Sequence, residues 1–175
     1  MASKGSRKYG RRCHSTADVR AESQHSVTLH NLPMAYPMTA QQALEFLSTG
    51  RRTGKLATVR ADGRPHVAPV WFVLDGEDVV FMTGAATAKG RSLRRDPRAA
   101  LAVDLEEPPY GFATVEGTVT LSTDLQEMFP HSLAIARRYV AAELAEQYAR
   151  RNAVDGEMLV RLHPEKIIAI ADMMG

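Results

Sequence analysis

Short apolar runs rich in β-branched residues recur along the chain between turn-forming residues, and this pattern predicts strands. The first two runs, residues 55–60 and 65–74, are joined by Ala-Asp-Gly-Arg, in which the glycine supplies the positive φ of a tight hairpin turn. A second turn, at residues 75–78, leads into the next run. The other predicted strands cover residues 79–83, 99–105, 112–121, 157–162 and 166–171.

Two short helices are predicted between these strands. Thr39 and Gln42 have the spacing of a capping box, which predicts a helix over residues 40–47. Thr87 similarly caps a second helix, which runs to about residue 95 and follows directly on the strand 79–83. The sequence therefore places helices at the periphery of a fold made mostly of strands.

Three features predict interruptions of these elements. Pro130 predicts a break in a third helical stretch, residues 123–151, and Gly117 predicts a bulge or bend in the strand 112–121. The tripeptide at residues 163–165, His-Pro-Glu, predicts a gap between the last two strands. Six or seven short strands with tight connections indicate a mostly β (α+β) fold, a closed or nearly closed antiparallel barrel, because parallel sheets need longer crossovers.

The length of 175 residues fits one domain, residues 39–175, preceded by a tail of residues 1–38. The tail has six Lys or Arg residues, two acidic residues and few apolar ones, which predicts a disordered basic segment. Contact of the tail with nucleic acid or anionic lipid, a transit-like role, and a misplaced start codon are alternatives.

Composition indicates a soluble protein of the cytoplasm. Cys13 is the only cysteine, so no internal disulfide can form. No apolar run approaches the roughly 18 residues of a membrane helix. We therefore expect no membrane partner and no nucleic-acid partner.

The chain lacks the usual motifs of nucleotide binding and nucleophilic catalysis, Gly-x-Gly-x-x-Gly, the Walker loop and Gly-x-Ser-x-Gly. Its six histidines have no His, Cys or carboxylate at ligand spacing, so no metal site is predicted. No residue is identified as catalytic from the sequence.

Residues 83–97, TGAATAKGRSLRRDP, gather hydroxyls, glycines and cations where a strand gives way to a helix. Backbone N–H groups and the helix dipole favour an anion at such a position. Lys89 and Arg91 can add charge-assisted bonds to phosphate, and Thr83 and Thr87 can donate hydroxyls. From composition, two interpretations stay open, a solvated helix and a phosphate cradle.

Several ordered segments together resemble the pyridoxamine 5′-phosphate oxidase-like split β-barrel family, and more narrowly its branch that uses coenzyme F420, a deazaflavin. The resemblance spans roughly residues 39–171 and rests on residues 54–72, 80–83, 89–90, 93–97 and 115–117. It implies a split antiparallel β-barrel of the FMN-binding type with short peripheral helices. It also implies a homodimer with the cofactor in a groove between the two barrels.

The resemblance implies roles for particular residues. The strand that ends at Thr83 and the turn that carries Lys89 hold the cofactor phosphate, which favours the cradle. The backbone of Pro69, Val70 and Trp71 lies along the ring. The implied cofactor-binding residues, some of them by adjacency alone, are Arg64, Pro69, Val70, Trp71, Met82, Thr83, Lys89, Arg91 and Ser92.

Departures from the family pattern favour F420 over FMN. Ala88 stands where FMN-binding members usually have arginine, and the second strand has Val67 and Phe72 in place of basic residues. Each missing phosphate contact is worth about 1.5–3 kcal/mol. F420 carries a phosphodiester and a polyglutamate tail, which a local excess of cations can attract. These cations are Arg60, Arg64, Lys89, Arg91, Arg94 and Arg95.

The resemblance implies an oxidoreductase that passes a hydride between the deazaflavin and a small organic substrate with a polarised double bond. Water is the expected proton donor, with His66 and Tyr139 as alternatives. An FMN-dependent enzyme like pyridoxamine phosphate oxidase shares these motifs. A protein that binds flavin, F420 or haem without turnover also shares them.

Overall fold

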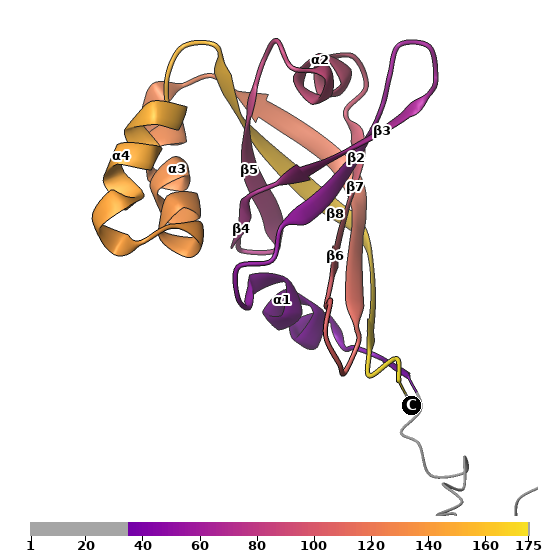
Figure 1. Cartoon of the computed structure of the whole chain (residues 1–175). Helices are drawn as coiled ribbons and strands as arrows, with labels where there is room; N and C mark the ends of the chain where they lie inside the picture. Colours follow the sequence, from indigo (N-terminus) through magenta and orange to yellow (C-terminus); the bar gives the residue numbers. More distant parts are fainter. Residues whose placement is uncertain (1–34, 175) are drawn as a thin grey trace, which may run out of the picture. The chain divides into compact units, whose positions relative to one another are not determined.

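A computed structural model of the chain describes residues 35–174. One antiparallel sheet has the strand order β3-β2-β6-β7-β8-β5-β4, and the short β1 adds to β8 (Figure 1). The strands are β1 (Tyr36–Pro37), β2 (Gly54–Val59), β3 (Pro65–Val70), β4 (Phe72–Asp75), β5 (Asp78–Gly84), β6 (Arg98–Asp104), β7 (Phe112–Ser122) and β8 (Glu157–Ala171). The sheet curls into a half-barrel, so the predicted split β-barrel fold is confirmed.

The curl is visible in the connection at Trp71. The sequence predicts one strand over residues 65–74, but the structure divides it into β3 and β4. β3 pairs with β2, whereas β4 pairs with β5, so the two strands lie at opposite ends of the strand order. The prediction of a single strand is wrong because the chain crosses at Trp71 from one end of the curled sheet to the other.

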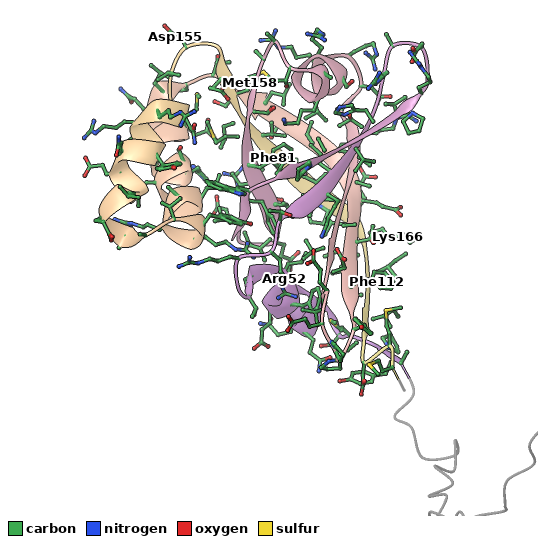
Figure 2. The ribbon with its side chains drawn as sticks, viewed as in Figure 1. Arg52, Phe81, Phe112, Asp155, Met158 and Lys166 are labelled. Atoms are coloured by element: carbon green, nitrogen blue, oxygen red, sulfur yellow. The ribbon has the colours of Figure 1, made fainter. Side chains whose placement is uncertain are left out.

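The core lies inside the curled sheet. Alternate residues of β2, β6 and β7 are buried there, and in β5 Phe81 also points inward, whereas Lys166 of β8 is exposed on the outside (Figure 2). Helix α1 (Ala40–Ser48) packs Leu47 against this core. Its predicted capping box is confirmed, since Thr39 and Gln42 each donate a backbone N–H to the other's side chain.

The predicted bulge at Gly117 is also confirmed, by a register shift between β7 and β8. A Cβ at Gly117 would lie 1.9 Å from the carbonyl oxygen of His163, so the close approach requires glycine. The predicted gap at residues 163–165 is wrong, because β8 is continuous. Pro164 pairs with Gly117 at the irregularity, where a strand tolerates a residue without an N–H donor.

A helical insertion joins β7 to β8. It comprises α3 (Leu125–Tyr139), the short 3-10 helix η2 (Ala142–Leu144) and α4 (Ala145–Asn152). The predicted break at Pro130 is wrong, because α3 continues through it. Packing holds the helix together, since Met128 is buried against the sheet and Ser132 donates a 3.2 Å hydrogen bond to Ala149 of α4.

The folded part begins before Thr39. Tyr36 and Pro37 pair with β8, and Met38 packs on the core, so these three residues belong to the domain although the sequence assigned them to the tail. Residues 1–34 of the predicted tail lie outside the described residues. None of the helices within residues 35–174 is long and apolar enough to cross a membrane.

Candidate cofactor site

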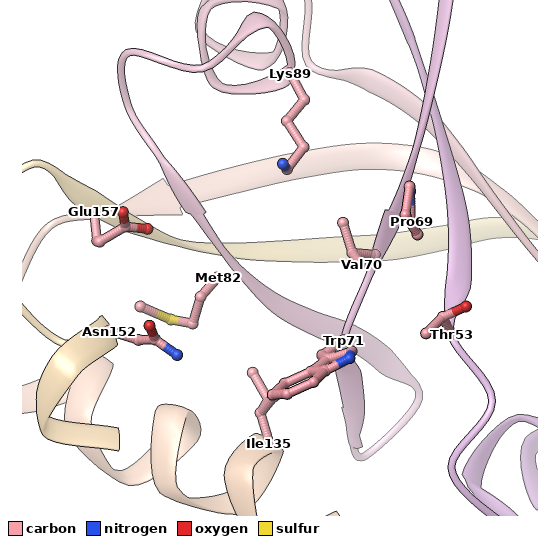
Figure 3. Close-up of a pocket in the computed structure, with 9 residues that line it drawn as sticks. All are labelled: Thr53, Pro69, Val70, Trp71, Met82, Lys89, Ile135, Asn152 and Glu157. Atoms are coloured by element: carbon pink, nitrogen blue, oxygen red, sulfur yellow. The ribbon is translucent and has the colours of Figure 1, made fainter. Parts of the chain in front are cut away.

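A pocket of about 390 Å³ opens between the β3–β4 crossover, the end of β5, the helix α2 (Ala88–Arg95) and the helical insertion (Figure 3). Its size is in the range of small-molecule sites, about 300–1,000 Å³. The lining residues come from seven separate parts of the chain and are Thr53, Pro69, Val70, Trp71, Met82, Lys89, Ile135, Asn152 and Glu157. Five of these are among the residues that the sequence predicts to bind the cofactor.

The start of α2 is fixed tightly on the end of β5. The hydroxyl of Thr87 caps the helix by accepting the N–H of Gly90 at 3.1 Å, and it lies 3.2 Å from the hydroxyl of Thr83. A Cβ at Gly90 would lie 2.3 Å from the carbonyl oxygen of Gly84, so only glycine fits. This contact places Lys89, in the first turn, where its side chain extends into the pocket (Figure 3).

Thr83 has a different place from the one predicted. Its side chain is buried and does not line the pocket. The contact of its hydroxyl with Thr87 ties the strand end to the helix cap. Thr83 therefore helps to position the first turn of α2, which carries Lys89.

Glu157 adds a carboxylate to the same pocket. It is the first residue of β8 and pairs with Gly84, the last residue of β5. Its side chain points into the pocket from the wall opposite Pro69 (Figure 3). Burial raises the pKa of Glu157 above its usual value, and the nearby Lys89 ammonium offsets part of this rise. No motif marks Glu157 in the sequence, so sequence reasoning missed it.

The floor of the pocket is aromatic. The Trp71 ring, which is 37% exposed, stacks on Tyr139 with centroids 5.0 Å apart and planes 1° apart. The Tyr148 ring is tilted relative to the Trp71 ring, and the centroids of these two rings are 6.3 Å apart. The Tyr139 hydroxyl accepts the N–H of Phe72 and donates to the carbonyl of Arg52, so it is already engaged with backbone groups. Tyr139 thus holds the crossover and supports Trp71.

Arg138 holds the same crossover from α3. Arg138 does not line the pocket and is only partly exposed. Its half-buried guanidinium donates to the carbonyls of Leu47, Gly50 and Phe72, at 2.7, 2.9 and 3.0 Å, and lies 4.4 Å from the Phe72 ring centroid. The insertion therefore fixes the pocket floor to the end of α1.

The structure separates the three remaining predicted residues from this pocket. Arg64, Arg91 and Ser92 line a second depression, of about 420 Å³, on another side of α2. Arg64 forms a 2.6 Å salt bridge with Asp62, and Arg91 donates to the carbonyl of Ala86. The other residues around this arginine depression are Arg60, Ala61, Asp62, Ala88 and Arg95.

Neither site shows the side chains of a metal centre. In the part of the chain that the structure describes, no three His, Cys, Asp or Glu side chains cluster as metal ligands would. His66 lies in β3, with its Nδ1 3.5 Å from the Thr58 hydroxyl, and does not line the pocket.

Comparison of the sequence with known protein families agrees with this geometry. The sequence profile of the pyridoxamine 5′-phosphate oxidase family matches residues 39–171, so the chain belongs to this family. The family predicted from the sequence is thereby confirmed.

Individual proteins resemble this chain at low sequence identity. An F420H(2)-dependent biliverdin reductase of Mycobacterium tuberculosis (strain CDC 1551 / Oshkosh) is 29% identical over 100 residues, which are 57% of this chain and 72% of the relative. A solved structure described as an F420 reductase is 26% identical, with a TM-score of 0.57, and the match covers 75% of this chain and 98% of that one. A conserved hypothetical protein of Mycobacterium tuberculosis shares the fold at 20% identity, with a TM-score of 0.66 and coverage of 77% and 86%.

Proposed function

We propose that the protein is an F420-dependent oxidoreductase that transfers a hydride between the deazaflavin and a small organic substrate with a polarised double bond. One observation carries the proposal. A lysine in the first turn of a helix and an apolar strand end line the same pocket, so one cavity offers a partner for a phosphate and a surface for a flat ring. The relatives named for F420 support this choice of cofactor.

The lining residues fit the two ends of such a cofactor. Lys89 is the cation of the pocket and would hold the phosphodiester, with the start of α2 behind it. Pro69, Val70 and Trp71 would lie along the ring. Met82 and Ile135 add apolar surface to the pocket.

When bound, reduced F420 supplies the hydride, and the protein supplies position, low water content and electrostatics. Tyr139 and Arg138 form hydrogen bonds with the backbone at the crossover, so contacts within the protein itself position this part of the pocket. Asn152 and Glu157 place an amide and a carboxylate on the opposite wall, where they can bind polar groups of cofactor or substrate (Figure 3).

The arginine depression has a part in this proposal. Its arginines are close to α2, beyond the pocket that holds Lys89. Exposed cations attract a flexible polyanion over about a Debye length, and they do so less at high salt. We propose that they attract the polyglutamate tail of F420 and do not hold the phosphate.

The homodimer remains part of the proposal. The middle of the outer face of β3, β2 and β6 is apolar, with Ala57 beside Val67 on one side and Ala100 on the other, while Lys55 and Asp104 form a salt bridge at one end of this face. Val67 is 62% exposed in the single chain. Covering this face with a second copy would place a partner close to Pro69 and the pocket. Light scattering after size-exclusion chromatography should give twice the mass of the chain.

A side-by-side titration tests the function. The purified protein should quench the fluorescence of F420 at lower concentrations than that of FMN or FAD, and it should oxidise reduced F420 when a suitable acceptor is added. Tight FMN binding without F420 binding would favour the FMN-dependent enzyme. F420 binding without turnover of any conjugated acceptor would favour a carrier protein.

A further inference from the structure

The pocket contains one acidic side chain beside its one basic side chain. Among its lining residues, only Lys89 and Glu157 carry a charge. The Lys89 ammonium is near enough to lower the pKa of Glu157, yet none of the salt bridges within residues 35–174 joins the two. A carboxylate next to the cation that would bind a phosphate is unexpected, because it repels the same ligand.

We propose that Glu157 selects the charge of the cofactor phosphate, so that the pocket accepts a singly charged phosphodiester and disfavours a doubly charged phosphomonoester. The inference rests on the proposed function, because it takes Lys89 as the phosphate partner. It goes beyond that function by giving a residue of β8 the role of distinguishing F420 from FMN.

The electrostatic argument compares the two ligands. A phosphomonoester has a charge of about −1.5 to −2 at pH 7, whereas a phosphodiester has a single negative charge. Repulsion from Glu157 grows in proportion to the ligand charge. Since Lys89 and Glu157 together carry no net charge, the pocket gives a dianion little compensation for the water that it loses on binding.

The fold holds Glu157 at the end of the pocket nearest α2. Its pairing with Gly84 fixes the backbone at the junction of β5 and α2. The side chain lies against that junction, since a Cβ at Gly84 would come within 3.1 Å of both Glu157 Oε1 and Thr87 Cγ2. The carboxylate therefore faces the region of Lys89 and is separated from Trp71 by Met82 (Figure 3).

Binding titrations of the full chain test the inference without any measurement of turnover. The variant Glu157→Gln keeps the shape of the side chain and removes its charge. The probes are F420, FMN and riboflavin, which lacks the phosphate. If F420 affinity rises about threefold in the variant, FMN affinity should rise about tenfold, because the repulsion lost is about twice as large. Riboflavin affinity should stay unchanged.

Two further variants complete the design. Glu143→Gln removes the same charge at an exposed position of η2 and should leave all three affinities unchanged. Glu157→Ala repeats the charge removal in case the glutamine variant does not fold, which circular dichroism would show. It should shift the ratio of FMN to F420 affinity in the same direction.

The outcomes separate the two proposals. If the wild type prefers F420 and the ratio of affinities stays the same in both Glu157 variants, the inference about Glu157 is wrong and the proposed function stands. If the wild type binds FMN as tightly as F420, or binds neither, the proposed function is wrong and the inference is overturned with it. An equal gain for riboflavin would show a steric effect and would also overturn the inference.

Discussion

Two sides of α2 carry cations in different settings. In the pocket, Lys89 comes from a helix start whose position is fixed by close backbone contact, and the pocket walls partly enclose it. In the arginine depression, Arg64 is paired with Asp62, Arg91 donates to the carbonyl of Ala86, and Arg95 donates to that of Val59. Under the proposed function, the site with the larger number of positive charges is not the one that holds the phosphate. The pocket and the arginine depression differ in how far they enclose their cations and in whether those cations already have hydrogen-bond partners.

The largest expected effect is at Lys89. Lys89→Met removes the charge and keeps most of the apolar stem, so F420 affinity should fall roughly 10- to 100-fold, the value of a charge-assisted bond to phosphate. Fluorescence quenching measures it. Lys166→Met, on the outside of β8, is the matched control and should bind F420 normally. Equal affinity of both variants would count against Lys89 as the phosphate partner.

The next effect concerns the support of α2. Gly90→Ala should destabilise the protein by about 1–3 kcal/mol through overpacking against the Gly84 carbonyl, although alanine favours helix formation. The melting temperature should fall by about 2–4 °C per kcal/mol, and F420 binding should weaken because Lys89 moves. Arg94→Ala, exposed in the same helix, should leave both unchanged. A melting temperature equal to that of the wild type would show that α2 is free to shift.

A smaller effect is expected in the arginine depression. The double variant Arg64→Ala and Arg91→Ala should weaken F420 binding by less than about threefold at low salt, because exposed charges act weakly and through screened fields. The loss should disappear at high salt, and riboflavin binding should not change. Titrations at two salt concentrations measure this, with Arg150→Ala in α4 as control. A loss as large as that of Lys89→Met would place the phosphate in the depression.

The smallest effect is a pH dependence of stability at Glu157. Burial raises the pKa of this carboxyl in the folded state, so its contribution to stability is present below the unfolded-state pKa and is lost as pH rises through the folded-state pKa. Glu157→Gln should therefore melt slightly higher than the wild type at pH 7 and at the same temperature near about pH 4. A variant that melts lower at pH 7 would indicate that the charged carboxylate has a favourable partner.

Local features of the fold were predictable from the sequence, and long-range ones were not. The capping box at Thr39 and the hairpin before Pro65 depend on neighbouring residues, and the bulge at Gly117 depends on a close approach of the backbone that only glycine permits. The crossover at Trp71 and the continuity of α3 through Pro130 depend on which strands and helices pack together. Single-sequence propensity does not contain that information.

Some residues of the candidate site were likewise predictable from the sequence, and others were not. The resemblance drew attention to Pro69, Val70, Trp71, Met82 and Lys89, which the structure brings to one pocket. Asn152 and Glu157 were missed because they come from the end of the insertion and the start of β8, and only the tertiary fold brings them to the pocket that Lys89 lines. Adjacency to the resembling segments also grouped Arg64 and Arg91 with Lys89, although these two arginines line the arginine depression and not the pocket.

The most direct test of the account is a crystal structure of the protein with F420 bound. We predict that a phosphodiester oxygen lies within hydrogen-bond distance of the Lys89 ammonium, with the ring along Pro69 to Trp71 and the acidic tail extending toward Arg91. A phosphodiester seated among Arg64, Arg91 and Arg95, with Lys89 in contact only with water, would contradict it.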